Sequence, residues 1–127
     1  MKDIRRSVVL GTSAALLAFG LGTAPGAVAA ETAAAACTHP DWSNKDAGVG
    51  SLEDGRSSAP LHSGPNAGCP VVGEALFYMD IYYHCYVFNS AGNTWSHVRA
   101  YNHFDDDSIN GWIWDPYLED VGSTRAC

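Results

Sequence analysis

The stretch LHSGPNAGCPVVG, residues 61–73, decides the fold. It contains two steps into proline, Gly64-Pro65 and Cys69-Pro70. Proline fixes φ, lacks an N–H donor and pushes the residue before it toward extended geometry. We therefore expect a sharply bent segment that runs on as a strand over residues 71–75. Cys69 lies at the bend, where a disulfide would hold it.

Strand patterning continues through the rest of the chain. The segment IYYHCYVF, residues 81–88, is dense in aromatic and β-branched residues, and TWSHVRAY (94–101) and GWIW (111–114) follow it. Asp115-Pro116 is typical of the N-cap and first position of a single helical turn, here ending at Leu118. Residues 102–110 are predicted to form a polar loop and residues 121–127 a short last strand or tail.

Short strands at this spacing, without a long helix, predict an all-β fold. We expect a small barrel of about five short strands with one 3-10 turn, occupying residues 60–127. The segment before it, residues 31–59, is polar and Gly-rich after an Ala-rich start, and is predicted to be an irregular arm tethered by a disulfide. Trp42 is the expected anchor of this arm.

The first 30 residues resemble a secretory signal peptide in composition. Lys2, Arg5 and Arg6 precede an apolar run over residues 8–21, and the small residues 27–30 suit cleavage. That run is short of the roughly 20 residues that a membrane span needs. Twin-arginine export through Arg5-Arg6 and lipidation at Cys37 are the alternatives. We expect a secreted or envelope protein with no membrane anchor after cleavage.

Charge narrows the range of partners. After cleavage, four cations (Lys45, Arg56, Arg99 and Arg125) face thirteen carboxylates, which gives a net charge of −9. Such a balance argues against binding to nucleic acid or anionic lipid. It keeps an exported protein soluble, and we expect a monomer.

Four cysteines, all after residue 30, predict two disulfides in an exported chain of this size. If residues 71–75 and 81–85 form a hairpin, Cys69 falls opposite Cys85, within disulfide range. Cys37 and Cys127 would then tie the two ends together. The predicted pairs are thus Cys69–Cys85 and Cys37–Cys127.

Several short motifs, in order, resemble the bacterial SH3-like (SH3b) domain. They are HSGPN (62–66), VVG (71–73), WSHV (95–98), GWI (111–113) and YL (117–118), and they cover roughly residues 60–121. The chain departs from the family in having His62 in place of the usual Arg, few basic residues, and the additional Cys69 and Cys85. No catalytic domain accompanies the motifs.

The resemblance implies a non-catalytic binding module that recognises cell-wall peptide, peptidoglycan or another extracellular ligand. It places Trp95 and Tyr117 at the borders of a peptide groove. Strand parity and strand ends add Trp112, Trp114 and Tyr82 to an aromatic surface, and partly exposed aromatic residues often mark binding surfaces. Two alternatives stay open: an arm that covers these rings as structure, and an interaction or inhibitor protein that acts on another exported protein.

Little in the sequence points to catalysis, a cofactor or a metal. There is no G-x-S-x-G elbow and no H-E-x-x-H motif, although His84 and His97 lie on neighbouring predicted strands. Residues 106–111, DDSING, resemble the start of a calcium loop, but Tyr117 stands where its last acidic ligand belongs. We therefore predict no enzyme activity, no cofactor and no metal site.

Overall fold

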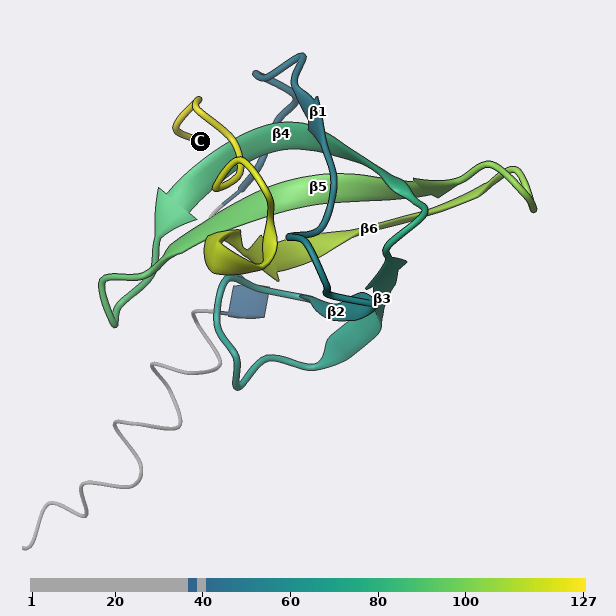
Figure 1. Cartoon of the computed structure of the whole chain (residues 1–127). Coiled ribbons are helices and arrows are strands. Elements are labelled where there is room, and N and C mark those ends of the chain that lie inside the picture. The colour runs from purple at the N-terminus through teal and green to yellow at the C-terminus, as the bar shows by residue number, and fades with distance from the viewer. Residues whose placement is uncertain (1–36, 39–40) are drawn as a thin grey trace, which may run out of the picture.

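The computed structural model describes residues 37–38 and 41–127 (Figure 1). The predicted signal peptide lies outside the described residues. The fold is all-β, as predicted, with antiparallel strands in one sheet and one 3-10 turn. The elements are β1 (Val49–Gly50), β2 (Ser58–His62), β3 (Val71–Leu76), β4 (Asp80–Phe88), β5 (Thr94–Asn102), β6 (Asp107–Trp114) and η1 (Asp115–Tyr117). Within the described part, no helix has the length and apolar character needed to cross a membrane.

The sheet is open rather than closed into a barrel. Its strands lie in the order β1-β4-β5-β6-β2-β3, so β1 and β3 form the two edges. β1 contributes only two residue pairs, and a single pair, His62↔Trp112, joins β2 to β6. Figure 1 shows β2 and β3 set apart below β4, β5 and β6. The weak β2–β6 junction and the very short edge strand explain why the six strands bend without closing.

Aromatic and β-branched residues correctly located three of the strands. β3, β4 and β5 begin and end within one residue of the predicted ranges. β6 begins at Asp107, four residues earlier than predicted, because residues 107–110 continue the pairing with β5. β2 was not predicted, since Pro60 and polar neighbours weaken its strand pattern.

The disulfides join Cys37 to Cys69 and Cys85 to Cys127, so the predicted pairing is wrong. That pairing assumed a hairpin between β3 and β4. In the sheet, β3 pairs with β2, whereas β4 pairs with β5 and β1, so Cys69 in the β2–β3 loop does not lie opposite Cys85 on β4. Closing loops of this size contributes about 4 kcal/mol for each disulfide in the chain-entropy model.

The hydrophobic core fills one face of the sheet. Ile81, Val98 and Ile113 of the central strands pack there, with no exposed surface, against Leu61 and Leu118. The opposite face carries a second layer of aromatic and imidazole side chains, of which Trp95, His97 and Trp112 are buried. In this layer Trp95 pairs with Trp114, and His97 pairs with Trp112.

The arm is fastened to the body of the protein at several points. Leu52 is buried in the core and forms a bridge with Leu118. The Asp46 carboxylate accepts hydrogen bonds from Ser123 Oγ at 2.6 Å and from the backbone of Thr124 at 2.9 Å. Burial alone would raise the pKa of Asp46, but these hydrogen bonds outweigh it and the pKa is lowered. An ionised Asp46 therefore joins the arm to the C-terminal segment.

Candidate functional site

Three of the five predicted binding residues, Trp95, Trp114 and Tyr117, line one groove of about 330 Å³. The groove lies where η1, the β4–β5 turn and the β2–β3 loop meet. Its other lining residues are Pro60, His62, Asn66, Ala67, Asn89, Ala91 and Asn93. The walls are thus mainly aromatic, and the rim is rich in amide side chains.

Strand register and η1 bring the three rings together. Trp95 on β5 stands opposite Trp114 on β6. η1 begins at Asp115 with Trp114 as its N-cap, one residue earlier than predicted, and it brings the Tyr117 ring to 5.0 Å from the Trp114 ring in an edge-to-face arrangement. Asp115 fixes the turn, because its buried carboxylate accepts a hydrogen bond from Ser96 Oγ at 2.7 Å. Burial raises the pKa of Asp115, although this hydrogen bond acts in the opposite direction.

Trp95 forms the inner wall of the groove and is more buried than predicted, with only 4% of its surface exposed. Its indole Nε1–H is buried and has no hydrogen-bond acceptor among the described residues. The His62 ring packs edge-on against it at 5.4 Å. His62 Nδ1 lies 2.8 Å from the carbonyl of Cys69 and must donate this hydrogen bond, because the carbonyl can only accept. Trp95 therefore lines the groove with its ring, whereas its indole N–H is enclosed and unpaired.

Two asparagines hold the loops at the rim. Asn89 Oδ1 accepts hydrogen bonds from the backbone of Ala91 and Asn93, which closes the β4–β5 turn. Asn66 Oδ1 does the same for Gly68 in the β2–β3 loop. These Asx turns shape the backbone on two sides of the groove before any ligand arrives.

The arm covers little of this groove. Trp42, the predicted anchor, stacks instead on His97 and His84, at ring distances of 3.8 and 4.7 Å. Arg56 of the arm contacts the aromatic wall, because its guanidinium lies 3.8 Å from the centre of the Tyr117 ring. One face of Tyr117 is therefore covered, whereas none of the described residues before Pro60 lines the groove.

Trp112 and Tyr82 lie elsewhere. Trp112 shares the outer sheet face with Trp114, as parity predicts, but lines a neighbouring cavity of about 270 Å³ beside Trp42 and His97. Tyr82 lies under the guanidinium of Arg99, 4.6 Å from it. The five candidates therefore do not form one surface, and only three share the groove.

His84 and His97 form a buried pair that the sequence only partly indicated. Their Nδ1 atoms lie 2.8 Å apart, so one ring donates a hydrogen bond to the other. A β-bulge in β4 between Tyr83 and Cys85 brings His84 alongside His97. Burial, and then the nearby charge of His84, lowers the pKa of His97 to about 3. Burial and Arg99 lower the pKa of His84 in the same way.

Two carboxylates of the segment that resembles a calcium loop have hydrogen-bond partners within the protein. Asp106 accepts a hydrogen bond from the Tyr101 hydroxyl, and Asp107 accepts one from the backbone of Ser108, as β6 begins. Over residues 37–38 and 41–127, no cluster of three or more His, Cys, Asp or Glu side chains is arranged to hold a metal ion. The groove is the feature of this site with a shape suited to a ligand.

No protein-family model matches the chain, and neither the curated proteins nor the solved structures include a match. Function must therefore be inferred from the site itself. Of the groove residues, His62 and Asn66 belong to the HSGPN motif, whereas Pro60, Asn89 and Asn93 were missed. The turn sequence NSAGN (89–93) marks a loop but does not reveal which end of the sheet it borders.

Proposed function

We propose that this protein is a secreted, non-catalytic binding module of the SH3b type that holds a peptide, such as the stem peptide of peptidoglycan, in the aromatic groove. The observation that carries the proposal is the convergence of Trp95, Trp114 and Tyr117 on one cavity. Trp95 and Tyr117 are the positions at which the resemblance to SH3b domains implies a peptide groove.

The chemistry of the groove suits a short chain of amides. Trp114 and Tyr117 meet edge-to-face, which leaves apolar ring surface for methyl and methylene groups of a ligand. The amide side chains that line the groove, Asn66, Asn89 and Asn93, would offer hydrogen bonds to the peptide groups of such a ligand. A cavity of about 330 Å³ falls at the lower end of the range for small-ligand sites.

Specificity would come from the rim. Arg56 stacks on Tyr117 and is paired with Glu53 at 2.6 Å, so a cation stands close to one wall of the groove. Stem peptides carry carboxylates, and a carboxylate entering beside Tyr117 would compete with Glu53 for Arg56. The preferred ligand would therefore carry a carboxylate as well as apolar groups.

The test uses the secreted protein and a soluble stem pentapeptide, followed by purified wall sacculi. Titration is monitored by tryptophan fluorescence, since two of the three rings are indoles. We expect Trp114→Ala and Arg56→Gln each to weaken binding at least tenfold, because both side chains are only partly buried and their loss should leave the fold intact.

The matched control is Phe104→Ala, which removes an exposed ring far from the groove. It should bind the pentapeptide like the unaltered protein. The proposal fails if the unaltered protein binds neither probe, or if Trp114→Ala and Phe104→Ala bind equally well.

A further inference from the structure

Three aromatic side chains form an exposed patch at the end of the sheet away from the groove. Phe77 and Tyr78 belong to the β3–β4 turn, and Phe104 belongs to the β5–β6 loop. Their rings pack edge-to-face in a row, at 5.3 Å and 5.2 Å. Exposed fractions of 67%, 37% and 79% leave this patch, here called the aromatic tip, largely in water. Neighbouring exposed aromatic rings are typical of binding surfaces.

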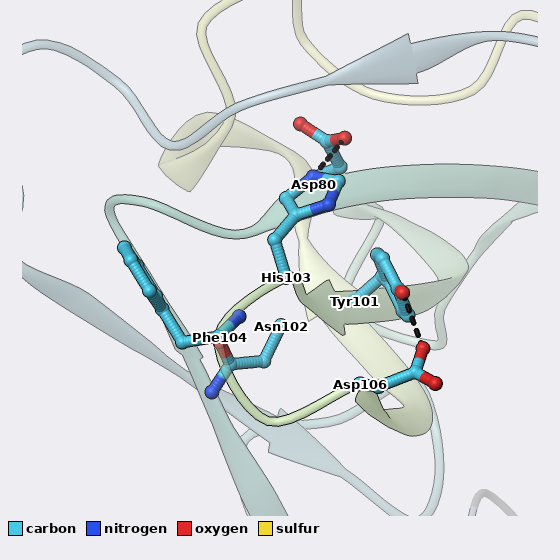
Figure 2. A network of polar contacts seen from close by, with 6 residues as sticks. All are labelled: Asp80, Tyr101, Asn102, His103, Phe104 and Asp106. Carbon is cyan, nitrogen blue, oxygen red and sulfur yellow. Dashed lines mark hydrogen bonds and ion pairs between the residues drawn. The ribbon is translucent and has the colours of Figure 1, made fainter.

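The loop that carries Phe104 is held by side-chain hydrogen bonds (Figure 2). Buried Asn102 accepts a hydrogen bond from the backbone of Phe104 through Oδ1 and donates one to Asp105 through Nδ2. Tyr101 donates to Asp106, which adopts a left-handed backbone conformation with φ of 52°. His103 reaches Asp80 at the start of β4, at 2.6 Å. Figure 2 shows the Phe104 ring pointing away from this network.

Such fixation matters for binding. An aromatic side chain on a flexible loop loses conformational entropy when it binds a partner, and that loss weakens the association. Here the loop is already ordered in the folded protein by hydrogen bonds that do not involve the Phe104 ring, so docking the ring requires little further loss of conformational entropy. The loop therefore presents an apolar side chain in one orientation, as a binding anchor requires.

The charge around the tip identifies the kind of partner. Asp105, Asp106 and Asp107 are exposed beside Phe104, and Asp80 lies close by. Two cations lie in this part of the molecule, and both are engaged: Arg99 lies on the Tyr82 ring, and Arg56, which lines a cavity with Phe77, is paired with Glu53. An aromatic patch with an anionic border fits an apolar pocket that has Lys and Arg around its rim.

We propose that the aromatic tip docks Phe104 into a cationic-rimmed apolar pocket of another exported protein. A second copy of this chain is disfavoured, because it would bring the same carboxylates together. Anionic lipid is disfavoured for the same electrostatic reason. The tip and the groove lie beyond opposite ends of β4, a nine-residue strand that spans roughly 27 Å. One molecule can therefore hold two partners at once.

The experiment is site-specific photo-crosslinking of the full chain, exported by the cells that make it. Phe104→p-benzoylphenylalanine keeps an aromatic ring at the tip, and Phe88→p-benzoylphenylalanine is the control, since Phe88 is 69% exposed at the other end of β4. We expect irradiation to give a protein adduct from position 104 and not from position 88. Mass spectrometry should find the link within a Lys- or Arg-rich segment of the partner.

Affinity measurements with that purified partner complete the test. Phe104→Ala should weaken binding by at least about 30-fold, as for an anchor residue, whereas Phe88→Ala should change it less than twofold. Raising salt from 50 to 500 mM should weaken binding, and Asp105→Asn with Asp107→Asn should reduce that salt effect while keeping amide oxygens as acceptors. Trp114→Ala should leave this affinity unchanged, which separates the tip from the groove.

The proposal is overturned by any of four results. These are no adduct at position 104, equal adducts at positions 104 and 88, an adduct with lipid or with a second copy, and binding that is indifferent to salt. An adduct at position 104 and the salt dependence of that binding do not depend on whether the groove binds a stem peptide, and Trp114→Ala shows whether an adduct at position 88 comes from the groove.

Discussion

Mild acid should destabilise this protein through the buried histidine pair, His84 and His97. In the folded state the pKa of His97 is lowered to about 3, whereas an exposed histidine in the unfolded chain titrates near 6.5. Between these two values the unfolded chain binds a proton at His97 and the folded protein does not. The stabilising contribution of neutral His97 is therefore complete above about pH 6.5 and is lost as the pH falls toward 3.

The size of the effect follows from proton linkage. Between pH 7 and pH 5, His97 alone should cost about 2 kcal/mol in the free energy of unfolding. This figure requires only that the folded pKa lie well below 5, and His84, whose pKa is also lowered, adds in the same direction. A loss of this size is a substantial part of the stability of a small protein.

The assay is urea unfolding at pH 7 and pH 5, followed by tryptophan fluorescence. His97→Gln cannot titrate and should lose about 2 kcal/mol less than the unaltered protein over this interval. His103→Gln is the control, because it removes a half-exposed imidazole and leaves the buried pair intact. Equal pH dependence in the unaltered protein and His97→Gln would refute the reasoning. If His97→Gln does not fold, an NMR titration that places the His97 pKa above 6 would refute it instead.

Other features make further predictions. Gly122→Ala should destabilise the protein by at least about 2 kcal/mol, because φ is 86° and a Cβ would lie 2.5 Å from buried polar atoms. Gly92→Ala should cost only about 1 kcal/mol, because Gly92 has a similar φ of 80° but nothing lies within 4 Å of the added Cβ. The urea midpoints of the two variants test this difference. Replacing both Cys85 and Cys127 with Ser should cost about 4 kcal/mol by the same assay, and a cost near zero would contradict the loop-closure argument. Trp42→Ala should uncover the histidine pair and raise both pKa values toward 6.5 in an NMR titration, and unchanged values would show that Trp42 does not desolvate them.

The local residue pattern predicted where most of the strands lie, but it did not predict which strands pair with each other in the sheet. β4 and β5 are rich in aromatic and β-branched residues, and such residues indicate strands wherever they lie in a sheet. The disulfide prediction failed because it required β3 and β4, adjacent in sequence, to pair. Pairing depends on distant segments such as β2 and β6, whose own patterns are weak.

The candidate site was predicted in part for a similar reason. Parity correctly put Trp95, Trp112 and Trp114 on one sheet face, because side chains alternate along a strand. The alternation of side chains along a strand does not show which part of that face the loops will enclose as a groove. It therefore could not show that Trp112 lies outside the groove that contains Trp95 and Trp114. The bulge at His84 also interrupts the alternation of side chains along β4, and the residues of the segment IYYHCYVF do not indicate a bulge.

The two disulfides also determine how the protein would respond to mechanical force. If the chain is pulled at Cys37 and Cys127, the load crosses directly from Cys37 to Cys69 and from Cys85 to Cys127. Only the fifteen residues 70–84 lie outside both covalent loops, and they extend by about 50 Å at most. The reduced chain between the same two points would reach about 300 Å. An oxidised molecule that links two partners would therefore act as a short tether even after its sheet had been pulled apart.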